Sequence, residues 1–178
     1  LDIDILDKIN NEYEISSIYH LAAILSTKAE KNPTLANDVN INGTINLLDL
    51  ASHQSKKQNK KISFFFPSSI AVYNVMQLEQ TKIDEYESCG IPVTQYGQAK
   101  LECEKIGKEY IDVDFRCIRF PGIISGVTIP SGGTSDFAPE MIHYAAQEIP
   151  YNCFINKDRR IPFIVMPDAI SAIFKIIK

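Results

Sequence analysis

Three short, largely apolar runs constrain the fold of this chain more than any other feature of its sequence. They cover 18–23, 62–66 and 115–120, and each is followed closely by small or turn-forming residues. Runs of this length between polar residues are typical of buried strands. The segments 33–53 and 96–110, which lie between the runs, repeat apolar residues at helical spacing. Strands that alternate with helices predict an α/β fold with a parallel sheet and flanking helices.

The remaining segments continue this alternation. Asn32 and Pro33 form a helix-start signal, since asparagine is a good N-cap and proline suits the first helical position. The polar, Lys-rich stretch 52–61 predicts a solvated loop. Later in the chain we expect a helix over 137–148 and a strand over 161–165, and a final helix that opens at Pro167-Asp168 and runs to the end.

Composition excludes several classes of function. The 178 residues carry a net charge of −4, so no basic excess indicates nucleic acid or an anionic membrane. No apolar run approaches the ~20 residues that a membrane-spanning helix needs. The four cysteines are not spaced as metal ligands, and we expect no metal and reduced thiols in a cytoplasmic protein. They are Cys89, Cys103, Cys117 and Cys153.

Tyr96 and Lys100 are four residues apart, so on a helix both side chains lie on one face. A tyrosine has an ordinary pKa near 10, and a nearby ammonium is expected to lower it toward the range of a general acid or base. Ser69, at a predicted strand end, is a candidate to hold the substrate oxygen. An isolated Tyr–Lys pair is equally expected on an exposed helix surface. The order of strand, two serines, loop and pair favours an active site.

The small residues that follow the predicted strands indicate where a ligand binds. Ala22-Ala23, Ser68-Ser69 and Pro121-Gly122 each come just after a predicted strand or at its end. Ligands of parallel α/β sheets bind at the carboxyl ends of the strands. We therefore expect these three pairs to line one binding site.

Five motifs follow one another in an order that resembles the extended short-chain dehydrogenases, the group of NAD-dependent epimerases and dehydratases. Within that group the segments Arg119–Ser125, Gly132–Ala138 and Arg160–Ala169 are most similar to the short-chain type of L-threonine 3-dehydrogenase. The five motifs are His20-Leu21-Ala22-Ala23, Asn40-Ile41-Asn42-Gly43-Thr44, Pro67-Ser68-Ser69-Ile70-Ala71-Val72-Tyr73, Tyr96-Gly97-Gln98-Ala99-Lys100 and Arg119-Phe120-Pro121-Gly122.

The resemblance implies a role for each matching residue. Tyr96 is the implied catalytic acid/base, Lys100 its electrostatic partner and a ribose contact, and Ser69 the residue that orients the substrate hydroxyl. The implied NAD-binding residues are Asp2, Leu21, Ala22, Ala23, Asn40, Ser68, Tyr96, Lys100, Pro121 and Gly122. The implied substrate-binding residues are Ser26, Ser69, Thr134, Ser135 and Asp136. An alternative for Asp136 is the N-cap of the helix that follows it.

The sequence departs from the family pattern in three respects. Asn74 stands where the group usually has glycine. The glycine-rich phosphate-binding turn and the acidic residue that selects NAD do not occur in these residues. The chain also opens at Leu1-Asp2 without a methionine. We therefore expect a partial Rossmann dinucleotide-binding domain over 1–122, and over 123–178 a mixed segment with the substrate-facing loop and the last strand and helix.

The resemblance predicts an enzyme that oxidises the 3-hydroxyl of L-threonine with NAD to 2-amino-3-oxobutanoate. One alternative is a nucleotide-sugar epimerase or dehydratase with the same catalytic residues. An alternative of another class is a catalytically inactive binding protein or fragment of this fold.

The resemblance also predicts a homodimer through the helices at 33–53 and 96–110. Apolar residues spread around more than one face of these helices, including Ile41, Ile45 and Leu48 on the first. Without a preceding phosphate-binding unit, the strand at 18–23 should form an unpaired apolar edge.

Overall fold

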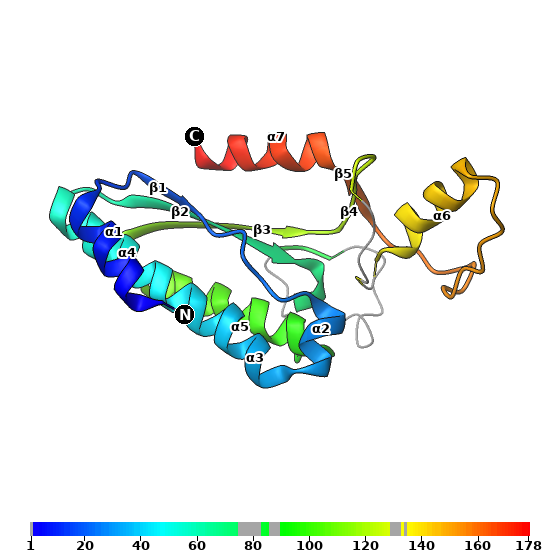
Figure 1. Cartoon of the computed structure of the whole chain (residues 1–178), viewed down its shortest axis with the longest axis horizontal. Coiled ribbons are helices and arrows are strands. Elements are labelled where there is room, and N and C mark those ends of the chain that lie inside the picture. Colours follow the sequence, from blue (N-terminus) through cyan, green and yellow to red (C-terminus); the bar gives the residue numbers. More distant parts are fainter. Residues whose placement is uncertain (1, 75–82, 86–89, 129–132, 134) are drawn as a thin grey trace. The chain divides into compact units, whose positions relative to one another are not determined.

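The structure is a computed structural model that describes residues 2–74, 83–85, 90–128, 133 and 135–178. It divides into two compact units (Figure 1). The first comprises Leu1–Arg119 with Ile177, and the second Phe120–Ile176 with Lys178.

A three-stranded sheet forms the centre of the first unit. Its strands are β1 (Ser17–Tyr19), β2 (Ile62–Ser69) and β3 (Val113–Phe120), in the order β1-β2-β3. β1 and β2 run parallel, with Ile18 opposite Phe64. Figure 1 shows helices α4 and α5 along one face of this sheet. The prediction of an α/β fold with a parallel sheet and flanking helices is confirmed.

One helix precedes the strands of the first unit, and other helices connect them. Their bounds are α1 (Ile3–Glu12), α2 (Ser26–Lys31), α3 (Pro33–Asn37), α4 (Gly43–Gln58) and α5 (Gln95–Glu109). A π-helical turn η1 (Asp38–Asn42) joins α3 to α4, and a short 3-10 turn η2 (Ile70–Val72) follows β2. Asn32 accepts a hydrogen bond from the amide of Leu35, so it caps α3 as its sequence predicts.

The core of the first unit lies between the sheet and the two long helices. Phe64 and Phe66 on β2 are buried, and both rings stack on Phe115 of β3, with centroids 5.9 and 6.1 Å apart. Leu48 of α4 and Cys103 of α5 are fully buried in the same cluster. Because Leu48 belongs to this core, it is not available for the dimer contact that the sequence predicts for it.

The predicted loop at 52–61 is wrong, because α4 continues to Gln58 before Asn59 ends it in a left-handed conformation. Gln54 in this stretch has no exposed surface. Its amide nitrogen donates to the carbonyl oxygens of Asn10 and Tyr13, and its Oε1 accepts from the amide of Ile15. Hydrogen bonds to α1 and to the segment after it, rather than apolar burial, therefore account for this end of the helix.

The second unit contains a smaller sheet. Strands β4 (Gly122–Ile124) and β5 (Phe163–Val165) are parallel, with Gly122 opposite Phe163. Helix α6 (Phe137–Ala146) begins with Phe137, whose ring packs edge-to-face on Phe163 at 5.6 Å. Helix α7 (Met166–Ile177) follows β5 and has proline at its start, as predicted.

The predicted strands and helices differ from the observed ones mainly at their ends. The strand expected at 18–23 is only three residues long and ends at Tyr19, although the amide of His20 still donates to the carbonyl oxygen of Phe65 at 3.0 Å. In the part of the chain that the structure describes, β1 pairs with β2 alone, so its other edge is open. None of the helices described here is long and apolar enough to cross a membrane.

Candidate active site

The end of β2 presents Ser68 and Ser69 to opposite sides, as the alternation of side chains in a strand requires. Ser68 is buried, and its hydroxyl donates to Glu104. Ser69 is half-buried, and its Oγ accepts a hydrogen bond of 3.1 Å from the amide of Ala71. That bond caps the turn η2, so the backbone fixes Ser69 at the carboxyl end of the strand.

The start of α5 carries Tyr96 and Lys100. Thr94 is the N-cap of this helix, and its Oγ1 accepts from the amide of Gly97 at 3.0 Å. Glu30 of α2 accepts from the amide of Gln95 at 2.7 Å. Both bonds satisfy amides that the first turn of a helix leaves without partners. The helix therefore begins at a defined point, with Tyr96 in its first turn.

Gly97 lets α5 approach the turn after β2 closely. A Cβ at this position would lie 2.2 Å from the carbonyl oxygen of Ala71 and 3.1 Å from the Cβ of Pro92. No side chain fits there without moving the backbone. Because Gly97 has no side chain, the start of α5, which carries Tyr96, can pack against the turn that follows Ser69. In the sequence, Gly97 stood out only as part of the motif Tyr96–Lys100.

Tyr96 is half-buried. Burial raises the pKa of Tyr96, and the hydrogen bond with Ser69 lowers it by less, so the net shift is upward. The sequence led us to expect a pKa lowered by the Lys100 ammonium. The reason for the difference is that desolvation of the phenolate dominates in this arrangement.

Lys100 is buried, with 4% of its surface exposed. Its ammonium donates to the carbonyl oxygen of Pro67 at 2.7 Å, and lies 4.4 Å from the ring centroid of Phe66 and 5.6 Å from that of Tyr96. Burial lowers the pKa of Lys100 to about 8. The structure thus brings Ser69, Tyr96 and Lys100 together at the carboxyl end of β2, where the sequence predicted an active site.

Asn40 supports the segment that follows β1. It lies within the π-helical turn and is buried. Its Oδ1 accepts from the amide of Ile24 at 2.7 Å, and its Nδ2 donates to the carbonyl of the same residue at 3.0 Å. Nearby, Leu21 and Ala22 are exposed. In this structure the Asn40 side chain holds the backbone of that segment, while Leu21 and Ala22 offer the open surface.

His20 is a buried polar residue at the same strand end. Its Nε2 lies 2.9 Å from Oγ1 of Thr44, while Nδ1 has no hydrogen-bond partner among the described residues. Burial and, to a smaller extent, the charge of Lys100 lower the pKa of His20 to about 4. His20 is therefore a neutral residue near pH 7.

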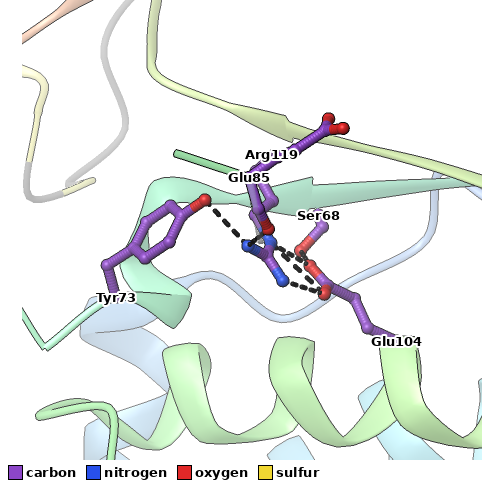
Figure 2. A network of polar contacts seen from close by, with 5 residues as sticks. All are labelled: Ser68, Tyr73, Glu85, Glu104 and Arg119. Carbon is purple, nitrogen blue, oxygen red and sulfur yellow. Dashed lines mark hydrogen bonds and ion pairs between the residues drawn. The ribbon is translucent and has the colours of Figure 1, made fainter. Parts of the chain in front are cut away.

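Figure 2 shows a charged network around Glu104 and Arg119 that includes Ser68. The sequence did not predict this network. Glu104 is buried, and Arg119 holds its carboxylate with both Nε and Nη2, at 2.9 and 2.7 Å. Arg119 Nη1 also donates to the hydroxyl of Tyr73 at 2.7 Å and to the backbone carbonyl of Glu85 at 3.2 Å. Burial opposes ionisation of Glu104, but the hydrogen bonds from Arg119 and Ser68 outweigh it and lower the pKa of Glu104.

The spacing of α5 was one available signal for this network. Glu104 follows Lys100 by four residues and Tyr96 by eight, so all three lie on one face of the helix.

Other predicted site residues belong to the second unit. A Cβ at Gly122 would lie 2.4 Å from the ring of Phe163 and 3.2 Å from the Cβ of Ser135, so Gly122 and Ser135 are neighbours. Asp136 occupies the N-cap position of α6, but its carboxylate accepts from the amide of Gly133 at 2.6 Å and makes no side-chain cap. Pro121 is half-buried next to Gly122.

Four more predicted site residues lie elsewhere in the sequence, and Ala23, which follows β1, is half-buried. Asp2 is exposed and caps α1 by accepting from the amide of Ile5 at 3.2 Å. Ser26 is buried at the start of α2. Thr134 lies outside the described residues.

The described residues contain no group of three or more His, Cys, Asp or Glu side chains placed to hold a metal ion.

The Ser–Tyr–Lys group lies at the carboxyl end of a strand in a parallel sheet, which is where open α/β sheets bind their ligands. The whole chain, residues 1–178, matches the NAD dependent epimerase/dehydratase family, and it belongs to that family. One curated relative is an uncharacterized epimerase/dehydratase of Staphylococcus aureus, 36% identical over 99% of this chain and 54% of the relative.

Solved structures of the family are also similar. A monomeric L-threonine 3-dehydrogenase from a metagenome superposes with a TM-score of 0.85 at 42% identity, covering 99% of this chain and 56% of that one. An L-threonine dehydrogenase of Clostridium difficile gives a TM-score of 0.87 at 34% identity, covering all of this chain and 55% of that one. The chain thus spans about half the length of these relatives.

Proposed function

We propose that these residues form part of an NAD-dependent dehydrogenase that oxidises the 3-hydroxyl of L-threonine to the ketone of 2-amino-3-oxobutanoate. The observation that carries the proposal is the convergence of Ser69, Tyr96 and Lys100 at the end of β2. The similarity to L-threonine dehydrogenases at 34–42% identity supports threonine as the substrate.

The residues at the strand ends fit one part of NAD. Leu21 and Ala22 leave an exposed, mostly apolar surface just after β1, and the buried Asn40 keeps the next stretch of backbone in place. Tyr96 and Lys100 supply hydroxyl and ammonium donors for a ribose. NAD, when bound, accepts the hydride that the substrate carbon loses.

Proton transfer falls to Tyr96. The interaction with Ser69 lowers the pKa of Tyr96, so the same serine can act on both the tyrosine and the substrate oxygen. Tyr96 accepts the proton of the substrate hydroxyl as a general base. Because burial raises the pKa of Tyr96, an ionised Tyr96 requires nearby positive charge, and the buried Lys100 ammonium is the nearest candidate.

Ser135 and Asp136 are the residues we assign to the amino-acid part of the substrate, together with Thr134. A carboxylate such as that of Asp136 pairs with an ammonium group, and hydroxyls such as that of Ser135 donate to a carboxylate. The Asp136 carboxylate is held in place by a hydrogen bond of 2.6 Å that it accepts from the amide of Gly133.

A nucleotide-sugar epimerase or dehydratase is the second candidate. Curated relatives at 36% identity carry the description epimerase/dehydratase. The two candidates differ in substrate, since a nucleotide sugar needs a site for a nucleoside diphosphate and threonine needs a site for an ammonium and a carboxylate.

The test is a substrate comparison with the full-length protein that carries these residues. NADH formation with L-threonine, together with thermal stabilisation by threonine in the presence of NAD, is the expected result. Stabilisation by UDP-glucose and not by threonine would favour the epimerase. No response to NAD or either substrate would favour an inactive binding protein. Tyr96→Phe serves as the control, because it removes only the phenolic oxygen.

A further inference from the structure

The Glu104–Arg119 pair contacts the segment that carries the proposed catalytic serine, Ser69, through the hydroxyls of Ser68 and Tyr73. It connects three elements: Glu104 on α5, Arg119 on β3, and the segment from Ser68 to Tyr73 that leaves β2 (Figure 2). The side chains of Glu104 and Arg119 have exposed fractions of 2% and 19%. Two charges removed from water in this way cost free energy unless every hydrogen bond is made.

The contacts of this pair fall on both sides of Ser69 in the sequence. Glu104 accepts from the hydroxyl of Ser68 at 2.5 Å, one residue before it. Arg119 donates to the hydroxyl of Tyr73 at 2.7 Å, four residues after it, and its guanidinium lies 4.9 Å from the centroid of that ring. The turn that carries Ser69 is therefore held at both ends by one ion pair.

The same helix that carries Glu104 also carries Tyr96. Glu104, Lys100 and Tyr96 are spaced by four residues along one face of α5. Lys100 donates to the carbonyl of Pro67 at 2.7 Å, so α5 holds the end of β2 at two successive residues, Pro67 and Ser68. Any shift of the strand end along the helix would break both bonds.

We propose that Glu104 and Arg119 are positioning residues that set Ser69 against Tyr96, and this rests on the proposed dehydrogenase function. Neither residue reaches the reacting atoms in this role. Their contribution is the alignment of the Ser69 hydroxyl with the Tyr96 hydroxyl, and displacements of about 1 Å in such an arrangement are enough to lower rates by about 10²-fold.

The test compares three variants of the full-length protein. Glu104→Gln keeps an acceptor for Ser68 but places an amide against the Arg119 guanidinium. Ser68→Ala removes the bond between Ser68 and Glu104 and leaves the bond between Lys100 and Pro67 in place. Asp114→Asn is the matched control, because Asp114 forms an ion pair with Arg116 of the same strand at 2.6 Å, and that ion pair includes no residue of the 68–73 turn.

We expect kcat to fall on the order of 10- to 100-fold in Glu104→Gln and less in Ser68→Ala, with KM for threonine changed by less than about 3-fold. The control should keep the wild-type kcat. A lower melting temperature with unchanged kcat in both variants would overturn the proposal and leave the pair a structural one. If Glu104→Gln does not fold, Ser68→Ala decides the matter by the same criterion.

A second readout does not depend on turnover. The hydrogen bond with Ser69 lowers the pKa of Tyr96, so displacement of Ser69 should raise it further. Ultraviolet titration of the phenol, with Tyr96→Phe as the blank, should show this rise in Glu104→Gln and Ser68→Ala but not in Asp114→Asn. An unmoved titration in both variants would overturn the positioning role even in a protein that does not oxidise threonine. A raised pKa of Tyr96 in a protein that does not oxidise threonine would support the positioning role and contradict the proposed substrate.

Discussion

Replacement of Gly97 by alanine tests the packing that brings α5 to the turn after β2. The new Cβ would lie 2.2 Å from the carbonyl oxygen of Ala71, a backbone atom that cannot rotate away, so helix and turn must separate by about 1 Å to reach van der Waals contact. Overpacking of this kind costs about 1–3 kcal/mol, and the higher helix propensity of alanine offsets up to about 1 kcal/mol of it.

The effect on activity should exceed the effect on stability. Because Tyr96 precedes Gly97, a shift of about 1 Å moves the phenol away from Ser69 and should lower kcat by about 10²-fold. The assay is NADH formation with threonine in the full-length protein, next to thermal unfolding. Gly126→Ala is the control, because a Cβ there meets nothing within 4 Å. Wild-type kcat in Gly97→Ala would refute the close packing as the source of the alignment.

The other predictions concern chemistry, specificity, cofactor and assembly. Tyr96→Phe should lower turnover by about 10²–10⁴-fold while NAD binding, measured by calorimetry, stays close to wild type; retained turnover would remove Tyr96 from the mechanism. 3-Hydroxybutyrate should be a poor substrate because it leaves the Asp136 carboxylate without an ammonium, so a kcat/KM equal to that of threonine would contradict that assignment. The 178-residue chain alone should bind NAD weakly, since it contains no glycine-rich phosphate-binding turn; a low-micromolar Kd in calorimetric titration would show that the pyrophosphate is held elsewhere. The full-length protein should sediment as a homodimer through α4 and α5, and a monomer would contradict this.

The apolar pattern of the sequence was sufficient for the sheet and for α5. β2 and β3 could be predicted because continuous apolar runs such as Phe64–Phe66 are stable only when they are buried in a core. The polar end of α4 was missed because Gln54 is buried through hydrogen bonds to partners some forty residues away, which leave no mark in local periodicity. α1 was missed for a related reason, since none of its residues is buried.

The candidate site was partly predictable for the same physical reasons. Ser69, Tyr96 and Lys100 could be brought together from helical spacing and strand order. The Glu104–Arg119 pair could not, because it depends on which strand lies opposite α5, and sequence spacing between the two residues does not fix that.

The π-helical turn at Asp38–Asn42 changes how the helical segment 33–53 should be understood. A turn of this kind accommodates one extra residue, and in an α-helix each residue advances the side chains by about 100°. The extra residue therefore rotates the helix after the turn by about 100° relative to the regular spacing of the helix before it. Residues on both sides of the turn can still face the same core. A single helical projection of the whole segment spreads their apolar side chains over several faces, although Ile41 and Leu48 both pack in one core cluster. Part of the apolar breadth that suggested a second, intermolecular face is thus the signature of an interrupted helix against a single partner.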